Sequence, residues 1–494
     1  MDRRAPHRAF ALAACLALAA PAGRAAPAKG LIRSELVAEL RRLVRVPPLR
    51  KARRGVAVAD LVSGQMLFEY QADRLCSVAS NNKLVTTAAA LELLGPRFRF
   101  RTTVAAHGKL RSDGVLEGDL VVVGRGDPSI SGRFHGGNPT AVLEKWAEAA
   151  AEAGIQSIRG GIVADETYFD RQHLHPEWPR DQRAAWYCAP IGALSFNDNC
   201  VLLTVRPGPK SGALAVASVD PPTAYVKLDN RCRTSKAQVG ANRVLAHRRL
   251  GTNVVSIRGH IRHKGGPFRT WITIREPALF TATVFAEVLE AKGIPVAGPV
   301  RLGVLPARVE EEELRRLVVT ESVLADAVAV ASSRSHNLYA EQMLKTLGAE
   351  RGREGSFAGG AEVVEAFLRD VVGVRGTFSY RDGSGLARSN RFSARQLLTL
   401  LRYMNTRRTG RIFLRSLAQP GEAGTLARRL LPLRGRVFAK TGYISGVSAL
   451  SGYVESRGGR LLAFVTLVND FRAPLGQVRA AQDAICLVLA AYEP

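Results

Sequence analysis

The sequence predicts a mixed α/β (α+β) fold, in which an antiparallel sheet flanked by helices is interrupted by a strand-rich insertion. A hairpin near the N-terminus and two turn-joined strands near the C-terminus indicate antiparallel pairing. Amphipathic helical segments lie near both ends of the chain, and between them short apolar strands alternate with glycine turns. The 494 residues, 46% of them hydrophobic, suffice for roughly two to four domains with large cores.

The N-terminal segment has the pattern of a secretory signal peptide. Three arginines within the first eight residues precede a short apolar run at 9–20, and small residues follow it. We therefore predict a signal peptide over residues 1–26, cleaved near Ala22 or Ala26, and export to the periplasm or extracytoplasmic envelope. The residues before Cys15 also fit a lipoprotein cleavage box with a lipidated cysteine, although the apolar run would then be very short.

Residues 27–102 form the first part of the predicted sheet domain. Residues 31–44 have helical periodicity, which a Pro-Pro pair ends. Residues 55–60 and 65–70 are predicted as the two strands of a hairpin around a Ser-Gly turn. A helix then begins at Ser80 and stops at a Gly-Pro pair.

The strand-rich insertion is predicted over residues 103–274, as two small nested domains, and residues 275–494 complete the sheet domain. The expected elements of the insertion are strands at 118–124, 160–165, 201–205 and 253–257 and a helix at 140–153. Those of the last part are helices at 278–292, 324–332, 338–347, 360–370, 393–403 and 477–491 and strands at 435–441, 447–454 and 461–468. No later segment reaches the length of a transmembrane helix.

The net charge of +27 indicates attraction to polyanions. Scattered arginines, an aromatic content of only 6% and the lack of a basic helix or stacking platform argue against a nucleic-acid partner. A solvated arginine-rich surface, or affinity for an anionic cell envelope, fits the composition better. A nucleic-acid-binding protein would instead show affinity that falls steeply with salt.

Five cysteines follow the signal segment, at positions that match no zinc pattern: Cys76, Cys188, Cys200, Cys232 and Cys486. Export permits one or two disulfides, most simply among the middle three. We expect no metal and no cofactor.

The first segment whose residues could catalyse a reaction is Ser80-Asn81-Asn82-Lys83. On a helix, Ser80 and Lys83 lie on one face, one turn apart. A lysine whose pKa is depressed by burial and nearby cations can take the proton of a serine hydroxyl and make it a nucleophile. The same spacing also occurs by chance on solvated helix faces, so further motifs must support it.

Two distant motifs support this pair. Ser335-His336-Asn337 lies at a break between two predicted helices, where Ser335 and Asn337 share a face in a turn. Lys440-Thr441-Gly442 ends a predicted strand and supplies a cation, a hydroxyl and a glycine that allows close approach to the backbone. In this order, the three motifs match the signature of penicillin-recognising serine enzymes.

The chain resembles a particular family, the D-alanyl-D-alanine carboxypeptidase/endopeptidases of the class C low-molecular-mass penicillin-binding proteins, related to penicillin-binding protein 4. The resemblance covers essentially the whole mature chain and implies a serine transpeptidase-like fold. Ser80 and Ser335 are 255 residues apart, far more than in a simple β-lactamase, and this family has a large insertion there. Beyond the three motifs, the similar segments are 94–100, 118–120, 124–128, 198–199, 337–341, 382–386 and 446–453.

The resemblance and the chemistry together imply a role for each motif residue. Ser80 attacks the substrate carbonyl, Lys83 accepts its proton, and Ser335 relays a proton to the leaving amine. Asn337 orients Lys83 and the substrate amide. Lys440 keeps the neighbourhood positive.

The strand that ends in Gly442 is expected to bind the substrate. Thr441 would hydrogen-bond its carboxylate, and the backbone amides of Ser80 and Tyr443 would form the oxyanion hole. Two positions depart from the family: Ser333 stands where a lysine is frequent, and Tyr443 where a small hydroxyl residue is usual.

Several other residues could have a functional role, but a structural role explains each of them at least as well. His173 and His175 suggest a metal site, but the neighbouring Pro176 and Trp178 favour a packed loop. Asp165 is either a contact for a diaminopimelate side chain, as in the family, or a strand-end carboxylate. The segment 382–385 is expected to be a turn that supports the cleft.

The expected function is that of a serine DD-peptidase acting on peptidoglycan stem peptides, as carboxypeptidase, endopeptidase or both, with β-lactams as covalent inhibitors. A β-lactamase, which needs fast deacylation, and a catalytically silent envelope scaffold are the alternatives. The intact motif residues argue against the scaffold. The sequence does not fix the oligomeric state.

Overall fold

The computed structural model describes residues 30–236, 242–304 and 314–494. The predicted signal peptide over residues 1–26, including Cys15, lies outside the described residues. Within these three ranges, no helix is long and apolar enough to cross a membrane.

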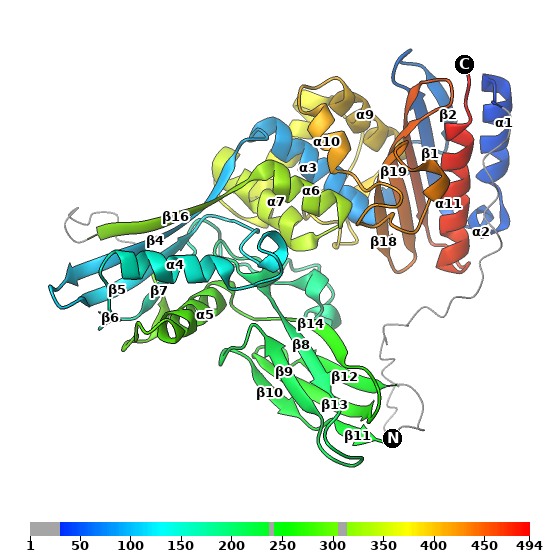
Figure 1. The fold of residues 1–494 in the computed structure, drawn as a ribbon. Helices are drawn as coiled ribbons and strands as arrows, with labels where there is room; N and C mark the ends of the chain where they lie inside the picture. The colour runs from blue at the N-terminus through cyan, green and yellow to red at the C-terminus, as the bar shows by residue number, and fades with distance from the viewer. Residues whose placement is uncertain (1–29, 237–241, 305–313) are drawn as a thin grey trace, which may run out of the picture.

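The part of the chain that holds the predicted catalytic residues Ser80, Ser335 and Lys440, which we call the catalytic part, is centred on a five-stranded antiparallel sheet. Its strand order is β18-β19-β20-β1-β2 (Figure 1). The N-terminal strand β1 pairs with the C-terminal β20, for example at Val58 and Phe464, so both ends of the chain build one sheet. The predicted hairpin and C-terminal strands are present. The strands are β1 (Arg53–Asp60), β2 (Met66–Tyr70), β18 (Val437–Ile444), β19 (Val447–Glu455) and β20 (Leu461–Asn469).

Both faces of this sheet are covered, because alternate residues of its strands belong to different cores. Val56 and Val58 of β1 pack with α1 and α11, whereas Ala57 and Ala59 face the large core that contains α3, α7 and α9. The helices of this part are α1 (Arg33–Leu43), α2 (Pro47–Arg50), α3 (Asn82–Leu93), α6 (Leu324–Ser333), α7 (Asn337–Arg351), α8 (Phe357–Ala366), α9 (Ala394–Asn405), α10 (Gly410–Ser416) and α11 (Leu475–Ala490).

Helix α3 is buried on all sides, since every residue from Asn82 to Leu91 is buried. A helix without a solvent face lies in the interior of a domain. It packs against α6 and α7, so the start of α3 is held between the sheet and these helices. A short sheet of β3 (Cys76–Ser77) and β17 (Arg391–Phe392) leads into it.

The insertion begins where β4 (Arg99–Leu110) leaves the catalytic part. Its main sheet has the order β15-β7-β5-β4-β16, with β6 beside β5, and α4 and α5 pack against it. Trp146 of α4 meets Phe285 of α5 edge to face at 5.4 Å. The remaining elements are β5 (Val115–Gly124), α4 (Ala141–Glu152), β6 (Ser157–Ile158), β7 (Ile162–Asp165), α5 (Pro277–Ala291), β15 (Val300–Leu302) and β16 (Leu314–Val323).

The insertion therefore shares its sheet and core with residues beyond the predicted boundary at 274. The physical reason is that the returning strand β16 runs antiparallel along β4, from Arg316 beside Ala105 to Val323 beside Arg99. Helix α5 contributes Phe280, Phe285 and other apolar residues to the core of the insertion.

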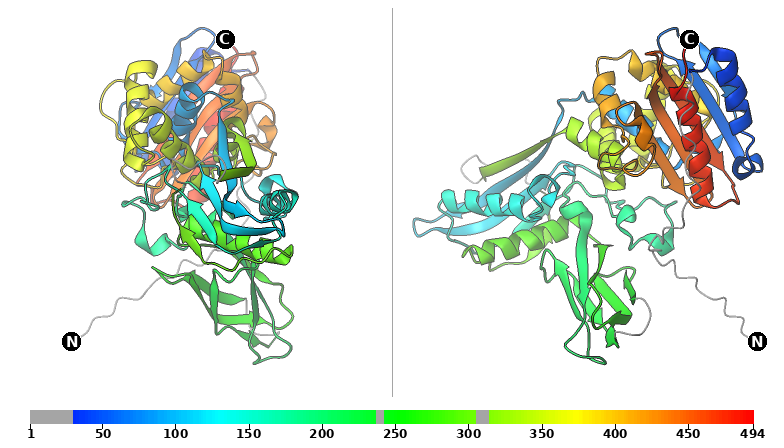
Figure 2. Two further views of the ribbon diagram at one scale, coloured as in Figure 1. Left: turned by 90° about the vertical axis from the view of Figure 1, so that its left-hand side faces the viewer. Right: turned by 45° about the vertical axis from the view of Figure 1, so that its right-hand side comes forward.

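A second, smaller part of the insertion projects away from the catalytic sheet (Figures 1 and 2). It contains a three-stranded sheet, β14-β8-β9, and a sheet in which β10, β11 and β12 all pair with β13. We call it the outer strand domain. Its strands are β8 (Cys200–Arg206), β9 (Val216–Asp220), β10 (Lys227–Asn230), β11 (Arg233–Ser235), β12 (Arg243–Arg248), β13 (Val254–Arg262) and β14 (Phe268–Thr273).

The sequence suggested disulfides among Cys188, Cys200 and Cys232, and this expectation is wrong. All five cysteines of the described chain are free and buried. Burial raises the pKa of the Cys188 thiol to about 12, so it stays protonated and acts as a small apolar side chain.

Candidate active site

Ser80, the predicted nucleophile, lies in a short 3-10 turn, Ala79–Asn81, which we call the nucleophile turn and which leads directly into α3. The two asparagines after it fix the turn: Asn81 donates to Ser451 Oγ of β19 at 2.6 Å, and Asn82 donates to the Asp382 carbonyl at 2.5 Å. Ala79 is held at a φ of 46°. Ser80 is thus the half-buried residue of an otherwise buried and anchored turn.

Lys83 is fully buried and makes three hydrogen bonds through its amine. Its Nζ lies 3.1 Å from Ser80 Oγ, 2.7 Å from Asn337 Oδ1 and 2.8 Å from the Ser384 carbonyl. Burial lowers the pKa of Lys83 from 10.5 to about 7, although the carboxylates of Glu341 and Asp382 oppose the shift. A neutral amine beside the serine hydroxyl is therefore accessible at neutral pH.

Glu341 is a buried carboxylate that sequence reasoning did not assign to the site. It lies on α7, one turn after Asn337, and accepts the backbone amides of Gly383 at 2.7 Å and Ser384 at 2.8 Å. Burial and the nearby Asp382 raise the pKa of Glu341 to about 8. Glu341 thereby positions the carbonyl that holds Lys83; its i+4 spacing from Asn337 was the available signal.

Asp382 fixes the rest of the same turn. It accepts the amides of Gly385 and Ala387, each at 2.7 Å, and the indole Nε1 of Trp178 at 2.8 Å. Gly385 has a φ of 82°, and a Cβ there would meet the Ala79 carbonyl at 1.9 Å. The predicted supporting turn at 382–385 is therefore packed directly against the nucleophile turn.

Ser335 and Lys440 form a second pair beside Ser80 and Lys83. Ser335 stands between α6 and α7 with a φ of 60°, and Lys440 Nζ donates to its Oγ at 2.7 Å. Lys440 is fully buried. Burial, together with the nearby Lys83, lowers the pKa of Lys440 well below its usual value. Each lysine thus disfavours the charged form of the other.

Asn337 connects the insertion to the nucleophile. Its Oδ1 accepts from Lys83, and its Nδ2 donates to the Tyr187 carbonyl at 2.7 Å. This contact fixes which amide atom faces Lys83. A backbone carbonyl carries no sequence signal, so the role of Tyr187 could not be foreseen.

Strand β18 lies at the edge of the sheet. After Ala439, the backbone groups on its free edge face the site. Ala439 exchanges both backbone hydrogen bonds with Ala418, on the side away from β19. In an antiparallel strand every second residue points its backbone the same way, so Thr441 and Tyr443 present theirs to this edge. The Thr441 carbonyl accepts from Lys440 at 2.9 Å.

Gly442 allows β18 to lie against the nucleophile turn. A Cβ at this position would meet the Val78 carbonyl at 2.8 Å and the Asn81 amide nitrogen at 3.2 Å. The glycine thus admits the protein's own backbone, where the sequence had suggested close approach of a ligand.

The two departures from the family occupy different environments. Tyr443 is 49% exposed, and Arg479 lies over its ring at 5.6 Å from the centroid. Ser333 closes α6, where its Oγ donates to the Ala329 carbonyl at 2.7 Å. Neither contact interrupts the hydrogen bonds of Lys83.

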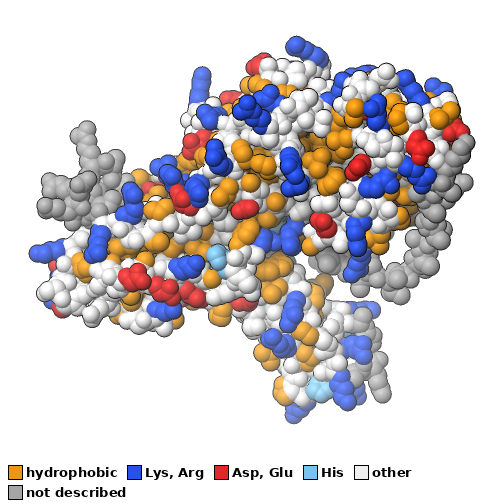
Figure 3. Space-filling model, turned by 45° about the horizontal axis from the view of Figure 1, so that its top comes forward, with side chains coloured by type: hydrophobic (Ala, Val, Ile, Leu, Met, Phe, Trp, Pro, Cys, Tyr) orange, Lys and Arg blue, Asp and Glu red, His pale blue; other side chains and the backbone are white. Residues whose placement is uncertain are grey.

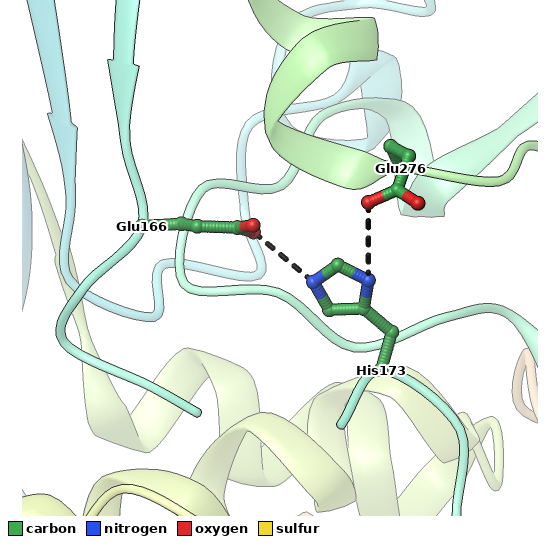
Figure 4. Close-up of side chains that lie close together, drawn as sticks. All are labelled: Glu166, His173 and Glu276. Atoms are coloured by element: carbon green, nitrogen blue, oxygen red, sulfur yellow. Dashed lines mark hydrogen bonds and ion pairs between the residues drawn. The ribbon is translucent and has the colours of Figure 1, made fainter. Parts of the chain in front are cut away.

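His173 lies between two carboxylates in the insertion (Figure 4). Its Nε2 is 3.2 Å from Glu166 and its Nδ1 is 3.6 Å from Glu276. The two carboxylates face opposite ring nitrogens, and Arg171 pairs with both of them at 3.2 Å. We interpret this group as an ion-pair cluster that fastens the segment after β7 to α5.

The other residues singled out in the sequence have structural contacts. His175 packs edge to face on Phe357 at 5.2 Å. Asp165 is a buried strand-end carboxylate that accepts the amide of Thr167 at 2.9 Å and its hydroxyl at 2.6 Å.

The arrangement supplies the parts that acyl transfer requires. A serine hydroxyl faces a buried amine, a second serine faces a second amine, and an edge strand presents backbone groups beside them. Covalent catalysis by serine needs such an adjacent base.

Comparison with known proteins identifies the family. The model of the D-Ala-D-Ala carboxypeptidase 3 (S13) family matches residues 36–492. A D-alanyl-D-alanine carboxypeptidase from Actinomadura sp. (strain R39) is 34% identical over 94% of this chain and 86% of its own length.

Solved structures show the same fold. Penicillin binding protein 4 from Haemophilus influenzae has a TM-score of 0.79 and 22% identity, covering 92% of this chain and 99% of the other. The same protein complexed with a β-lactam has a TM-score of 0.72 and 21% identity, covering 92% and 100%. With its family model, its curated relative and its fold in agreement, the chain belongs to the D-Ala-D-Ala carboxypeptidase 3 (S13) family.

Proposed function

We propose that this protein is a serine DD-peptidase that cleaves peptidoglycan stem peptides through an acyl-enzyme on Ser80. The observation that carries the proposal is the position of Lys83 Nζ, buried and within hydrogen-bond distance of both Ser80 Oγ and Asn337 Oδ1. A lysine pKa of about 7 makes this amine a suitable general base near neutral pH.

The first half of the reaction forms an ester. Lys83 takes the Ser80 hydroxyl proton as Oγ attacks the carbonyl carbon of the D-Ala–D-Ala bond. The tetrahedral intermediate collapses, the C–N bond breaks, and the proton that Lys83 took passes through Ser335 to the leaving amine, which leaves Lys83 neutral again. Lys440 contacts the relaying Ser335 Oγ at 2.7 Å. Terminal D-alanine departs.

The second half of the reaction consumes water. Lys83 accepts a proton from the water that attacks the ester, and the proton returns to Ser80 as its C–O bond breaks. A β-lactam would form the same ester with slow release, as a covalent inhibitor. The β-lactam complex of the Haemophilus influenzae protein supports this part of the proposal.

Strand β18 would bind the substrate in the extended form. Its edge between Thr441 and Tyr443 offers backbone groups for strand addition. The amides of Ser80 and Tyr443 would stabilise the oxyanion, a contribution of about 10²–10³ in rate for each donor. Thr441 would bind the terminal carboxylate.

We also propose an extracytoplasmic location, reached through the signal peptide at residues 1–26. The net charge of +27 supports contact with an anionic cell envelope. Peptidoglycan, the substrate in this proposal, lies in that compartment.

Digestion of purified peptidoglycan, with mass analysis of the products, tests the proposal. The wild-type protein is expected to release D-alanine from pentapeptides, to split cross-linked dimers, or both, whereas Ser80→Ala does neither. Equal product patterns would contradict the mechanism. No release by either protein would favour the silent scaffold, and rapid turnover of a fluorescent penicillin would favour a β-lactamase.

A further inference from the structure

Positive charge is concentrated in the outer strand domain. Residues 206–269 hold 13 Lys and Arg against two Asp, a net charge of +11 out of the +27 of the whole chain. Figure 3 shows blue side chains standing out on this domain, at the bottom of the view. A small part of the chain thus carries a large share of its charge.

Much of this charge points outward from one sheet. Val244, Val255, Ile257 and Ile261 of β12 and β13 are buried in the core of the insertion. Side chains alternate along strands, so the residues between them face away from this core. The cations among these outward positions and those of β10 and β11, which we call the basic face, are Lys227, Arg233, Arg243, Arg258 and Arg262.

The strand register spreads these cations into an array. Arg243 of β12 and Arg233 of β11 both lie opposite His260 of β13, so the three form one row across the sheet. Rows follow one another by about 7 Å along a strand, and neighbouring strands lie about 4.8 Å apart. Such a surface suits an extended partner with repeated charges better than a single small anion.

The basic face retains its excess charge because it has little internal compensation. Along the described strands β10 to β13, Asp229 is the one carboxylate. Arg258 donates to it at 2.8 Å, and Arg231 and Arg249 pair with it as well. Three arginines therefore share a single negative charge.

The side chains of the basic face favour one class of polyanion. Guanidinium groups bind phosphate oxygens in pairs. Binding of single-stranded nucleic acid relies on aromatic stacking, and no outward position of these described strands holds Phe, Tyr or Trp. Insertion into a bilayer needs an apolar surface, whereas Leu245, 54% exposed, is the one large exposed apolar side chain on the described strands β10 to β13.

We infer that the basic face binds a linear polymer of the cell envelope that carries repeated phosphodiesters. This inference rests on the proposed location of the protein and not on its proposed chemistry. The outer strand domain projects away from the catalytic sheet (Figure 1), so such a polymer would hold the enzyme at its substrate and leave the cleft open.

Binding of the full chain to synthetic poly(glycerol phosphate) tests the inference, with vesicles of phosphatidylglycerol and a single-stranded oligonucleotide as competing probes. The wild-type protein should bind the polymer best, and more weakly as added salt screens the charges. Replacing Lys227, Arg233 and Arg243 by Gln should weaken binding at least tenfold.

A matched control removes the same charge elsewhere. Arg353, Arg408 and Arg411 are exposed residues of the catalytic part, and replacing them by Gln should change the affinity less than twofold. Equal losses in the two variants, no binding by wild type at low salt, or tighter binding to vesicles or oligonucleotide would each overturn the inference. Binding is measured apart from turnover, so a protein inactive on peptidoglycan still tests it.

Discussion

At the scale of single residues, the site depends on the amine of Lys83, whose protonated form is disfavoured by burial. Lys83 is fully buried, and its hydrogen bonds lead to oxygen atoms of Ser80, Asn337 and Ser384. Desolvation favours the neutral form of this amine, which is the form that can accept a proton.

Acylation should therefore lose rate in acid. Protonation of Lys83 removes the base, so the acylation rate constant for a fluorescent penicillin should fall about tenfold per pH unit below about pH 7 and level off above it. Stopped-flow measurement across this range gives the profile. Lys83→Arg, which stays charged, should lose about 10²–10⁴ in rate at all pH values; a flat wild-type profile would contradict Lys83 as base.

Glu341→Gln should alter this profile in a defined direction. Whenever Glu341 is ionised it holds a proton on Lys83 and raises the pKa of that amine, so a neutral amide in its place should move the acidic limb to lower pH. The new amide also faces one of the Gly383 and Ser384 N–H groups without accepting from it, which costs about 1–3 kcal/mol.

The same acylation assay measures the change in the Glu341→Gln variant. The control is Glu290→Gln, an exposed carboxylate of α5, which should leave the profile unchanged. A shift of the limb to higher pH, or none, would show that Glu341 does not act on Lys83.

The residue scale also shows what the sequence could reveal about the site. Ser80, Lys83, Ser335, Asn337 and Lys440 stand in short motifs. Direct hydrogen bonds join Lys83 to Ser80 and Asn337, and Lys440 to Ser335. Their partners, such as the Ser384 and Tyr187 carbonyls, are backbone atoms and have no signature of residue type. The pKa shift of a buried group likewise depends on the packing around it, which no local sequence pattern shows.

At the scale of elements, the contact at Gly442 sets how closely β18 approaches the nucleophile turn. Gly442 is the residue at which the strand meets Val78 and Asn81. The strand register then sets which backbone groups face the substrate.

Gly442→Ala should widen this contact and impair catalysis more than folding. The added methyl group would lie 2.8 Å from a backbone oxygen, so β18 must shift. We expect at least a tenfold loss in acylation rate with a modest fall in Tm, from kinetics and thermal unfolding of the same sample. Gly476→Ala lies in α11 and its Cβ meets nothing within 4 Å, so this variant should lower neither the rate nor Tm. An unimpaired Gly442→Ala would contradict the tight contact.

Elements with strong periodicity were predictable, whereas the long-range strand pairing within the insertion was not. The helix and strands at each end of the chain have clear caps, turns and apolar stripes. The pairing of β16 with β4 joins residues about 200 positions apart, and local periodicity contains no information on such pairs.

At the scale of the whole molecule, the insertion is tied to the catalytic part by buried polar contacts. Lys345 of α7 is fully buried and donates to Asp170 at 2.5 Å and to the Gln172 carbonyl at 3.0 Å, with its amine 4.5 Å from the Phe357 ring. The segment it holds continues to Tyr187, whose carbonyl accepts from Asn337.

Lys345→Met should therefore lower both stability and activity. Loss of one partner of a buried ion pair costs about 3–5 kcal/mol, and the partly exposed Asp170 places this case near the lower value. Urea unfolding and the acylation rate measure the two effects. Lys292→Met, which breaks an exposed pair with Glu148, should cost less than about 1 kcal/mol; a similar result for Lys345 would mean that the tie is weak.

The central claim is that Ser80 becomes acylated with Lys83 as its base, and mass spectrometry of the intact protein after exposure to a penicillin tests it most directly. The account predicts a mass increase of one penicillin, located by peptide mapping on Ser80, and no increase in Ser80→Ala. Attachment at another residue, or equal labelling of both proteins, would contradict it.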